Sequence, residues 1–151
     1  MGTTTFSGPV RSGTLKTGET NGPNLGYAVL EQETSITQNS TTAVSSTLYI
    51  PVGSKIVDII VDVLTAFNSA TSAVLSVGTA AAGTQYAGSV DAKTAGRVRP
   101  TFTAAQLAAM SNVSVLGVAA PTPAPVVVTV TPTGATSAGY LRVTIVYAQL
   151  A

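Results

Sequence analysis

The residues best suited to acid–base chemistry are two aspartates, Asp58 and Asp62, within SKIVDIIVDVL at residues 54–64. Residues four apart on a strand share a face, and their Cα atoms lie roughly 13 Å apart at the usual strand rise. That separation is wide for two carboxylates that must act together on one substrate. We therefore interpret both as solvated acids at a sheet edge, and we expect a solvated face at Glu31 and Glu33 as well.

A second group of charges lies in DAKTAGRVRP at residues 91–100, and it consists of Asp91, Lys93, Arg97 and Arg99. A nucleic-acid site would need more positive charge and interleaved aromatic side chains. We expect an exposed loop whose cations form salt bridges with an acidic surface of a neighbouring subunit, or with Asp91. The four residues are thus a candidate inter-subunit contact.

The composition excludes several kinds of chemistry. The chain has no His and no Cys, so the common catalytic triads, thiolate or imidazole metal sites and disulfides cannot form. We expect a protein without catalysis, cofactor or metal. A formal net charge of +1 provides no field to attract nucleic acid or a membrane surface. No run approaches the ~20 apolar residues that span a bilayer.

The low content of charge is informative in its own right. Charged residues make up 9% of the 151 residues, against about 25% in typical globular domains. Because a lone soluble protein usually has a well-charged surface, this composition favours a protein that buries much of its surface against copies of itself or a larger scaffold. The alternative is a surface made polar by Thr and Ser.

These residues must be positioned by strands. Alternation and β-branched runs predict strands at residues 27–36, 44–51, 54–64, 72–78, 84–90, 112–118, 126–133 and 140–149. In the third of these, Val57, Ile59, Val61 and Val63 share a wholly apolar face that should lie in the core. About seven to nine short strands of this kind predict an all-β fold, a β-sandwich of jelly-roll-like form.

The connections between these strands are also predicted. A short helix is expected at residues 102–110, where Thr103 and Gln106 have the spacing of a capping box. The three prolines of PTPAP, residues 121–125, predict an extended loop. The last two strands should then form a closing hairpin.

Residues 1–26 form a separate segment ahead of a single β-sandwich domain at residues 27–151. The segment is rich in Thr and Gly and cannot bury enough apolar surface to fold alone. We expect an extended N-terminal arm that becomes ordered when a partner holds it, and a frayed terminus is the alternative. Its contact residues would be Phe6, Pro9, Val10, Arg11, Leu15 and Lys16.

Four stretches carry a family resemblance: FSGPVRSG in the arm, TAFNSATSAVLSVGT, SVDAKTAGRVRPTFTAAQLAAM and TPTGATSAGYLRVTIVYAQ. Together they resemble the small head decoration (capsid cement) proteins of tailed bacteriophages, over roughly residues 6–148. The match consists of structural residues and includes no chemical signature.

The resemblance implies a non-catalytic virion protein that folds in the host cytoplasm. Such a protein binds the exterior of the capsid, clamps neighbouring major capsid subunits and commonly forms a homotrimer. The alternative is another phage structural component, such as a head fibre base, a tail tube or a tail-fibre module. A carbohydrate-binding β-sandwich is less favoured, because it usually stacks exposed aromatic side chains on sugar and this chain has no Trp.

Overall fold

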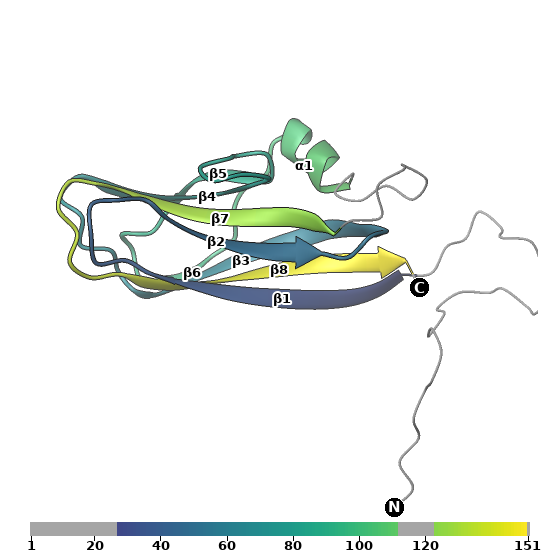
Figure 1. The fold of residues 1–151 in the computed structure, drawn as a ribbon, viewed down its shortest axis with the longest axis horizontal. Helices are drawn as coiled ribbons and strands as arrows, with labels where there is room; N and C mark the ends of the chain where they lie inside the picture. Colours follow the sequence, from purple (N-terminus) through teal and green to yellow (C-terminus); the bar gives the residue numbers. More distant parts are fainter. Residues whose placement is uncertain (1–26, 112–122, 151) are drawn as a thin grey trace, which may run out of the picture.

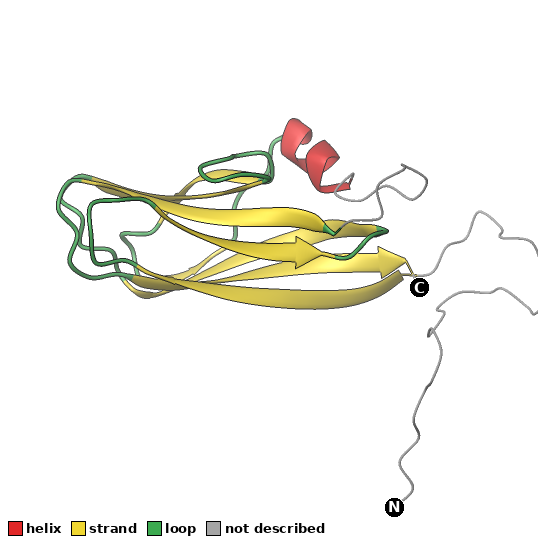
Figure 2. Cartoon of the chain, in the orientation of Figure 1, coloured by secondary structure: helices red, strands yellow, loops and turns green. Residues whose placement is uncertain are grey.

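A computed structural model of the chain describes residues 27–111 and 123–150. These residues form eight strands and one short helix (Figure 1; Figure 2). In chain order the elements are β1 (Tyr27–Thr37), β2 (Val44–Ile50), β3 (Ser54–Thr65), β4 (Ser72–Gly78), β5 (Ala87–Asp91), β6 (Gly96–Val98), α1 (Ala104–Ser111), β7 (Ala124–Thr133) and β8 (Tyr140–Leu150). The predicted all-β architecture with one short helix is confirmed.

Two four-stranded antiparallel sheets form a β-sandwich. One has the order β1-β8-β3-β6 and is called the β1 sheet; the other has the order β2-β7-β4-β5 and is called the β2 sheet. The pairing is nested, because β1 pairs with β8, β2 with β7, β3 with β6 and β4 with β5. Two more pairings, β3 with β8 and β4 with β7, complete the sheets. The first and last strands therefore lie side by side (Figure 1).

The predicted closing hairpin of residues 126–133 and 140–149 is wrong. β7 belongs to the β2 sheet and β8 to the β1 sheet, so the segment between them crosses from one sheet to the other. β7 already lies between β2 and β4, and β8 lies between β1 and β3. Neither strand has a free edge for the other, which local sequence could not indicate.

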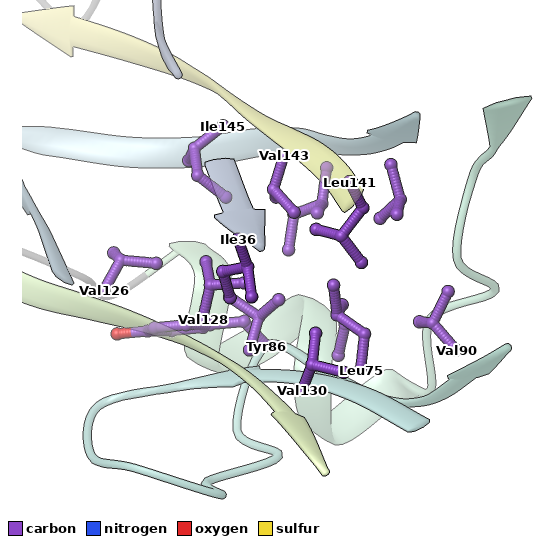
Figure 3. Close-up of a cluster of buried hydrophobic side chains, with 14 of the residues drawn as sticks. Ile36, Leu75, Tyr86, Val90, Val126, Val128, Val130, Leu141, Val143 and Ile145 are labelled. Carbon is purple, nitrogen blue, oxygen red and sulfur yellow. The ribbon is translucent and has the colours of Figure 1, made fainter. Parts of the chain in front are cut away.

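The core lies between the two sheets, and aliphatic side chains from both inner faces fill it (Figure 3). One face of β4 and one face of β8 contribute to this core. Their buried residues are Ala73, Leu75 and Val77 on β4, and Leu141, Val143, Ile145 and Tyr147 on β8. Alternate residues of a strand point to the same face, and on β4 the polar Ser76 is buried as well, at 8% exposed.

The predicted core face of β3 is wrong at its first residue. Ile59, Val61 and Val63 are buried, but Val57 is 50% exposed and Ile56 takes its place in the core at 4% exposed. A register shift against β8 lies between Ile56 and Asp58, which indicates a β-bulge at this point. An extra residue in a strand reverses the alternation that follows it.

The helix α1 begins as its capping residues predict. The backbone N–H of Thr103 donates to Oε1 of Gln106 at 2.9 Å, and the backbone N–H of Gln106 lies 3.2 Å from the Thr103 hydroxyl. These reciprocal bonds satisfy amide groups that the first helical turn leaves unpaired. In the last turn Met110 is buried in the core, which holds this end of the helix against the sandwich.

The predicted extended loop at residues 121–125 is wrong at its end, because β7 begins at Ala124 and includes Pro125, whereas Pro123 lies outside any strand. Pro125 is paired with β2, whereas the pairing of β7 with β4 starts only at Val127. A proline is accepted where a strand has a neighbour on one side only. The predicted strand at 112–118 and the arm at 1–26 lie outside the described residues.

The loop between β3 and β4 contains a core residue that the sequence did not reveal. Phe67 is 1% exposed, and its ring lies against Gly139 just before β8. A Cβ added to Gly139 would lie 2.4 Å from Cδ1 of Phe67, so the ring fits only because this position has no side chain. Residues 91–100, predicted as an exposed loop, also include β6, which pairs with β3.

Candidate functional site

Charged side chains from all four strands of the β1 sheet gather on its outer face, and Asp62 on β3 is their centre. Its Oδ1 lies 2.6 Å from Nε of Arg97, and its Oδ2 lies 3.0 Å from Nη2 of the same residue. Nη2 of Arg142 donates to the same Oδ2 at 2.9 Å. The carboxylate of Asp62 therefore accepts a bidentate pair of bonds from Arg97 and one further bond from Arg142.

The strand register brings these residues together. Asp62 is directly opposite Arg142 on β8 and Arg97 on β6. On the far side of β8, Nε of Arg142 lies 3.3 Å from Oε2 of Glu33 on β1. That contact is an ion pair without hydrogen-bond alignment, since the buried Nε of Arg142 has no hydrogen-bond partner. We call Glu33, Arg142, Asp62 and Arg97 the charged row, which crosses all four strands of the sheet.

Hydrogen bonding determines the protonation state at the centre of the charged row. The bonds from Arg97, and then those from Arg142, hold the pKa of Asp62 far below its usual value, and they outweigh the opposing effect of burial. The same bonds raise the pKa values of Arg97 and Arg142. Asp62 is consequently a fixed anion at neutral pH and is unsuited to exchange protons with a substrate.

Asp58, the other candidate acid, is also engaged. Its Oδ2 accepts a bond from Nη1 of Arg99 at 2.8 Å, and its Oδ1 accepts the backbone N–H of Ile59 at 2.8 Å, next to the bulge of β3. The interpretation of both aspartates as solvated acids is wrong for Asp62, whose side chain is only 10% exposed. The sequence did not predict this burial, because Arg97 on β6 covers Asp62. β6 is a three-residue strand with too little periodicity to be recognised.

The predicted loop contact divides into two parts. Arg97 and Arg99 have acidic partners within the chain, on β3 rather than at Asp91. Asp91 instead accepts the backbone N–H of Lys93 at 3.0 Å, and this bond is the largest cause of its lowered pKa. Nζ of Lys93 donates to the carbonyl oxygen of Thr71 at 3.3 Å. A role of these four residues between subunits stays a prediction.

Exposed apolar side chains lie on the same sheet. On β1, Tyr27 is 41% and Val29 is 66% exposed, and Val57 protrudes at the bulge of β3. Nζ of Lys55 lies 4.6 Å from the centre of the Tyr27 ring, a distance suited to a cation–π contact. Together with the charged row they form a mixed surface of the kind found in protein interfaces.

The remaining site predictions concern metal ions, membranes and the arm. Within residues 27–111 and 123–150, no group of three or more acidic, His or Cys side chains could hold a metal ion. The helix in that part of the chain is too short and too weakly apolar to cross a membrane. The predicted arm contacts, Phe6, Pro9, Val10, Arg11, Leu15 and Lys16, lie outside the described residues.

Comparisons with known proteins give a likeness in fold. No protein-family model and no curated protein matches the sequence. Among solved structures, a chain of the cyanophage Pam1 capsid asymmetric unit is similar, with a TM-score of 0.52 and 19% sequence identity. The likeness covers 90% of this chain and 94% of that chain. At this identity the comparison shows a shared fold.

Proposed function

We propose that this protein is a structural component of a tailed-phage virion, located on the exterior of the capsid. There it binds the major capsid protein as a decoration (cement) protein and stabilises the shell by clamping neighbouring subunits, without catalysis. The observation that carries the proposal is the fold likeness to a chain of a cyanophage capsid asymmetric unit over 90% of this chain. This likeness in fold supports the same role as the resemblance of the sequence to capsid decoration proteins, and the two observations are independent.

The chemistry of the chain supports a structural role. Catalytic groups are scarce because the sequence has no His and no Cys. The two aspartates best suited to acid–base chemistry are both bonded to arginines on the outer face of the β1 sheet. A chain with 9% charged residues and exposed Tyr27, Val29 and Val57 has a surface that suits burial against other proteins.

The nested pairing supports a jelly-roll form of the sandwich. A jelly roll forms when one long hairpin wraps into two packed sheets, so that the first strand pairs with the last and the pairing continues inward along the chain. The eight described strands, in two four-stranded sheets, pair in this way. Jelly rolls are common in viral capsid domains. We further propose that the protein assembles as a homotrimer on the shell, where many identical weak contacts act together.

In this proposal residues 1–26 form the arm that reaches the capsid or a neighbouring subunit. Tyr27, where β1 begins, is paired with Leu150 near the end of β8. We expect that deleting residues 2–20 leaves the sandwich folded, because the core comes from residues 36–147. Binding to undecorated phage heads should be lost, because the arm becomes ordered on binding and supplies contact area. The sandwich domain alone does not replace that area.

The experiment compares the truncated chain with the full-length chain by co-sedimentation with heads. Circular dichroism and the urea midpoint establish that the deletion leaves the domain folded. A second variant, in which residues 2–20 are replaced by an equal length of Gly and Ser, separates the arm's sequence from its length. The proposed role of the arm is wrong if the truncated protein coats heads with unchanged affinity.

A further inference from the structure

The charged residues of the sandwich are divided unequally between its two sheets. The strands of the β1 sheet carry seven of them, two on β1, three on β3 and one each on β6 and β8. In the β2 sheet the strands β2, β4 and β7 carry none, and β5 at the sheet edge ends with one, Asp91. We call the outer face of the β2 sheet the neutral face, and on β2 and β7 it includes Ser45, Thr47, Tyr49, Val127, Thr129 and Thr131.

The polar groups in the middle of the neutral face already have partners. The hydroxyl groups of Ser45 and Thr129 lie 2.8 Å apart. The backbone N–H of Ala82 donates to the Thr129 hydroxyl at 2.9 Å, so the loop between β4 and β5 lies on this face. Thr129 is 1% exposed, whereas Tyr49 protrudes at 59% exposed. A protein that covers the neutral face therefore leaves few polar groups without a hydrogen bond.

Burial against another protein costs the two outer faces different amounts of hydration energy. The cores of protein interfaces are depleted of charged residues and enriched in aromatic ones, and a charge taken out of water must regain that energy from well-aligned partners. A protein on the outer face of the β1 sheet would cover the charged row. A protein on the neutral face covers hydroxyl and apolar groups around Tyr49. The neutral face therefore loses less hydration energy on contact.

The size of the neutral face and the symmetry of its contacts indicate what covers it. β7 has ten residues and β2 and β4 have seven each, so a four-stranded face of this length spans roughly 500 Å² at the usual strand spacing and rise. A stable pair of proteins buries about 800 Å² on each partner, so this face alone would hold a second copy only weakly. A face packed on its own copy also gives a two-fold pair, which is not a contact of the proposed trimer.

We infer, on the basis of the proposed function, that the neutral face lies against the shell and contacts an uncharged polar surface of the major capsid protein. Many copies act together on a shell, and the proposed arm adds contact area to each, so a face of this size is sufficient. The charged row then points away from the shell. A charged outer surface of this kind keeps the decorated particle soluble.

Charges placed on each side of the sandwich test this orientation with undecorated heads. Thr47→Lys and Thr47→Glu should each weaken head binding about tenfold or more, because either variant buries an unpaired charge on the neutral face. A shell surface of opposite charge would instead strengthen binding of one of the two. Val57→Lys and Val57→Glu are the matched controls on the β1 sheet, where Val57 is 50% exposed, and they should bind as the unmodified chain does. Circular dichroism and urea midpoints establish that all four variants are folded.

A second experiment measures burial directly and uses the absence of Cys. Thr47→Cys and Val57→Cys are each labelled with a maleimide, free in solution and bound to heads. We expect heads to protect the thiol of Thr47→Cys and to leave that of Val57→Cys reactive.

Three results would overturn the orientation while head binding itself is intact. They are equal labelling of the two thiols on heads, preferential protection of Val57→Cys, and unchanged head binding by the charged variants of Thr47. Protection of Thr47→Cys in the concentrated free protein would also overturn it, because a second copy would then occupy the neutral face. If the unmodified chain does not sediment with heads, the proposed function is wrong and the orientation is wrong with it.

Discussion

Replacement of Asp62 by Asn tests the idea that the charged row fixes β6 to the sandwich. Removal of one partner from a buried ion pair costs about 3–5 kcal/mol. The side chains of Arg97 and Arg142 are 60% and 37% exposed, so water can hydrate them in the variant. With that screening, the loss of three bonds between charged groups should destabilise the protein by about 2 kcal/mol.

Urea unfolding followed by circular dichroism measures this loss. For a domain of this size a loss of about 2 kcal/mol lowers the urea midpoint by about 1 M. Asp58→Asn is the matched control, because it removes one bond to the exposed Arg99 and should cost less than about 1 kcal/mol. Amide exchange at Arg97 and Val98 should also rise in Asp62→Asn, since β6 loses its anchor. Equal midpoints for the two variants would refute the role given to the charged row.

Two further predictions concern pH and packing. Stability should be constant between pH 6 and 8, because the chain has no His. Stability should fall in acid, because the pKa of Asp62 is lowered in the folded state. The contribution of Asp62 to stability is therefore present above its unfolded pKa of about 3.9 and is lost as the pH falls through the folded pKa. A thermal-melting series across pH checks both statements, and a change above about 1 kcal/mol between pH 6 and 8 would contradict the first. Gly139→Ala should destabilise by about 1–3 kcal/mol, because its Cβ would overlap the ring of Phe67; an unchanged urea midpoint would show that the ring can move aside.

The fold class could be predicted from sequence because the buried faces of strands such as β4 and β8 follow simple alternation. The helix could be predicted because its capping signal is local, between Thr103 and Gln106. Strand order was beyond such reasoning. The segments at 126–133 and 140–149 look like a hairpin, and only the positions of β2, β4, β1 and β3 determine that they belong to different sheets.

The charged row shows the same limit at the level of single residues. Asp62 and Arg97 are 35 residues apart, and each looks like a solvated charge in its own segment. Their contact depends on β6 pairing with β3, and a three-residue strand has no pattern that would identify it in the sequence. The bulge near Val57 was missed for a related reason, since an inserted residue leaves the composition of the strand unchanged.

The most direct test of the proposed function is sedimentation of the purified protein with undecorated heads of the proposed parent phage. The molar mass of the free protein is measured by light scattering. We predict an oligomer in solution, with a trimer as the proposed form, that co-sediments with heads in a fixed ratio to the major capsid protein. A monomer that stays in the supernatant at every concentration would contradict the proposal and would favour a tail or fibre component.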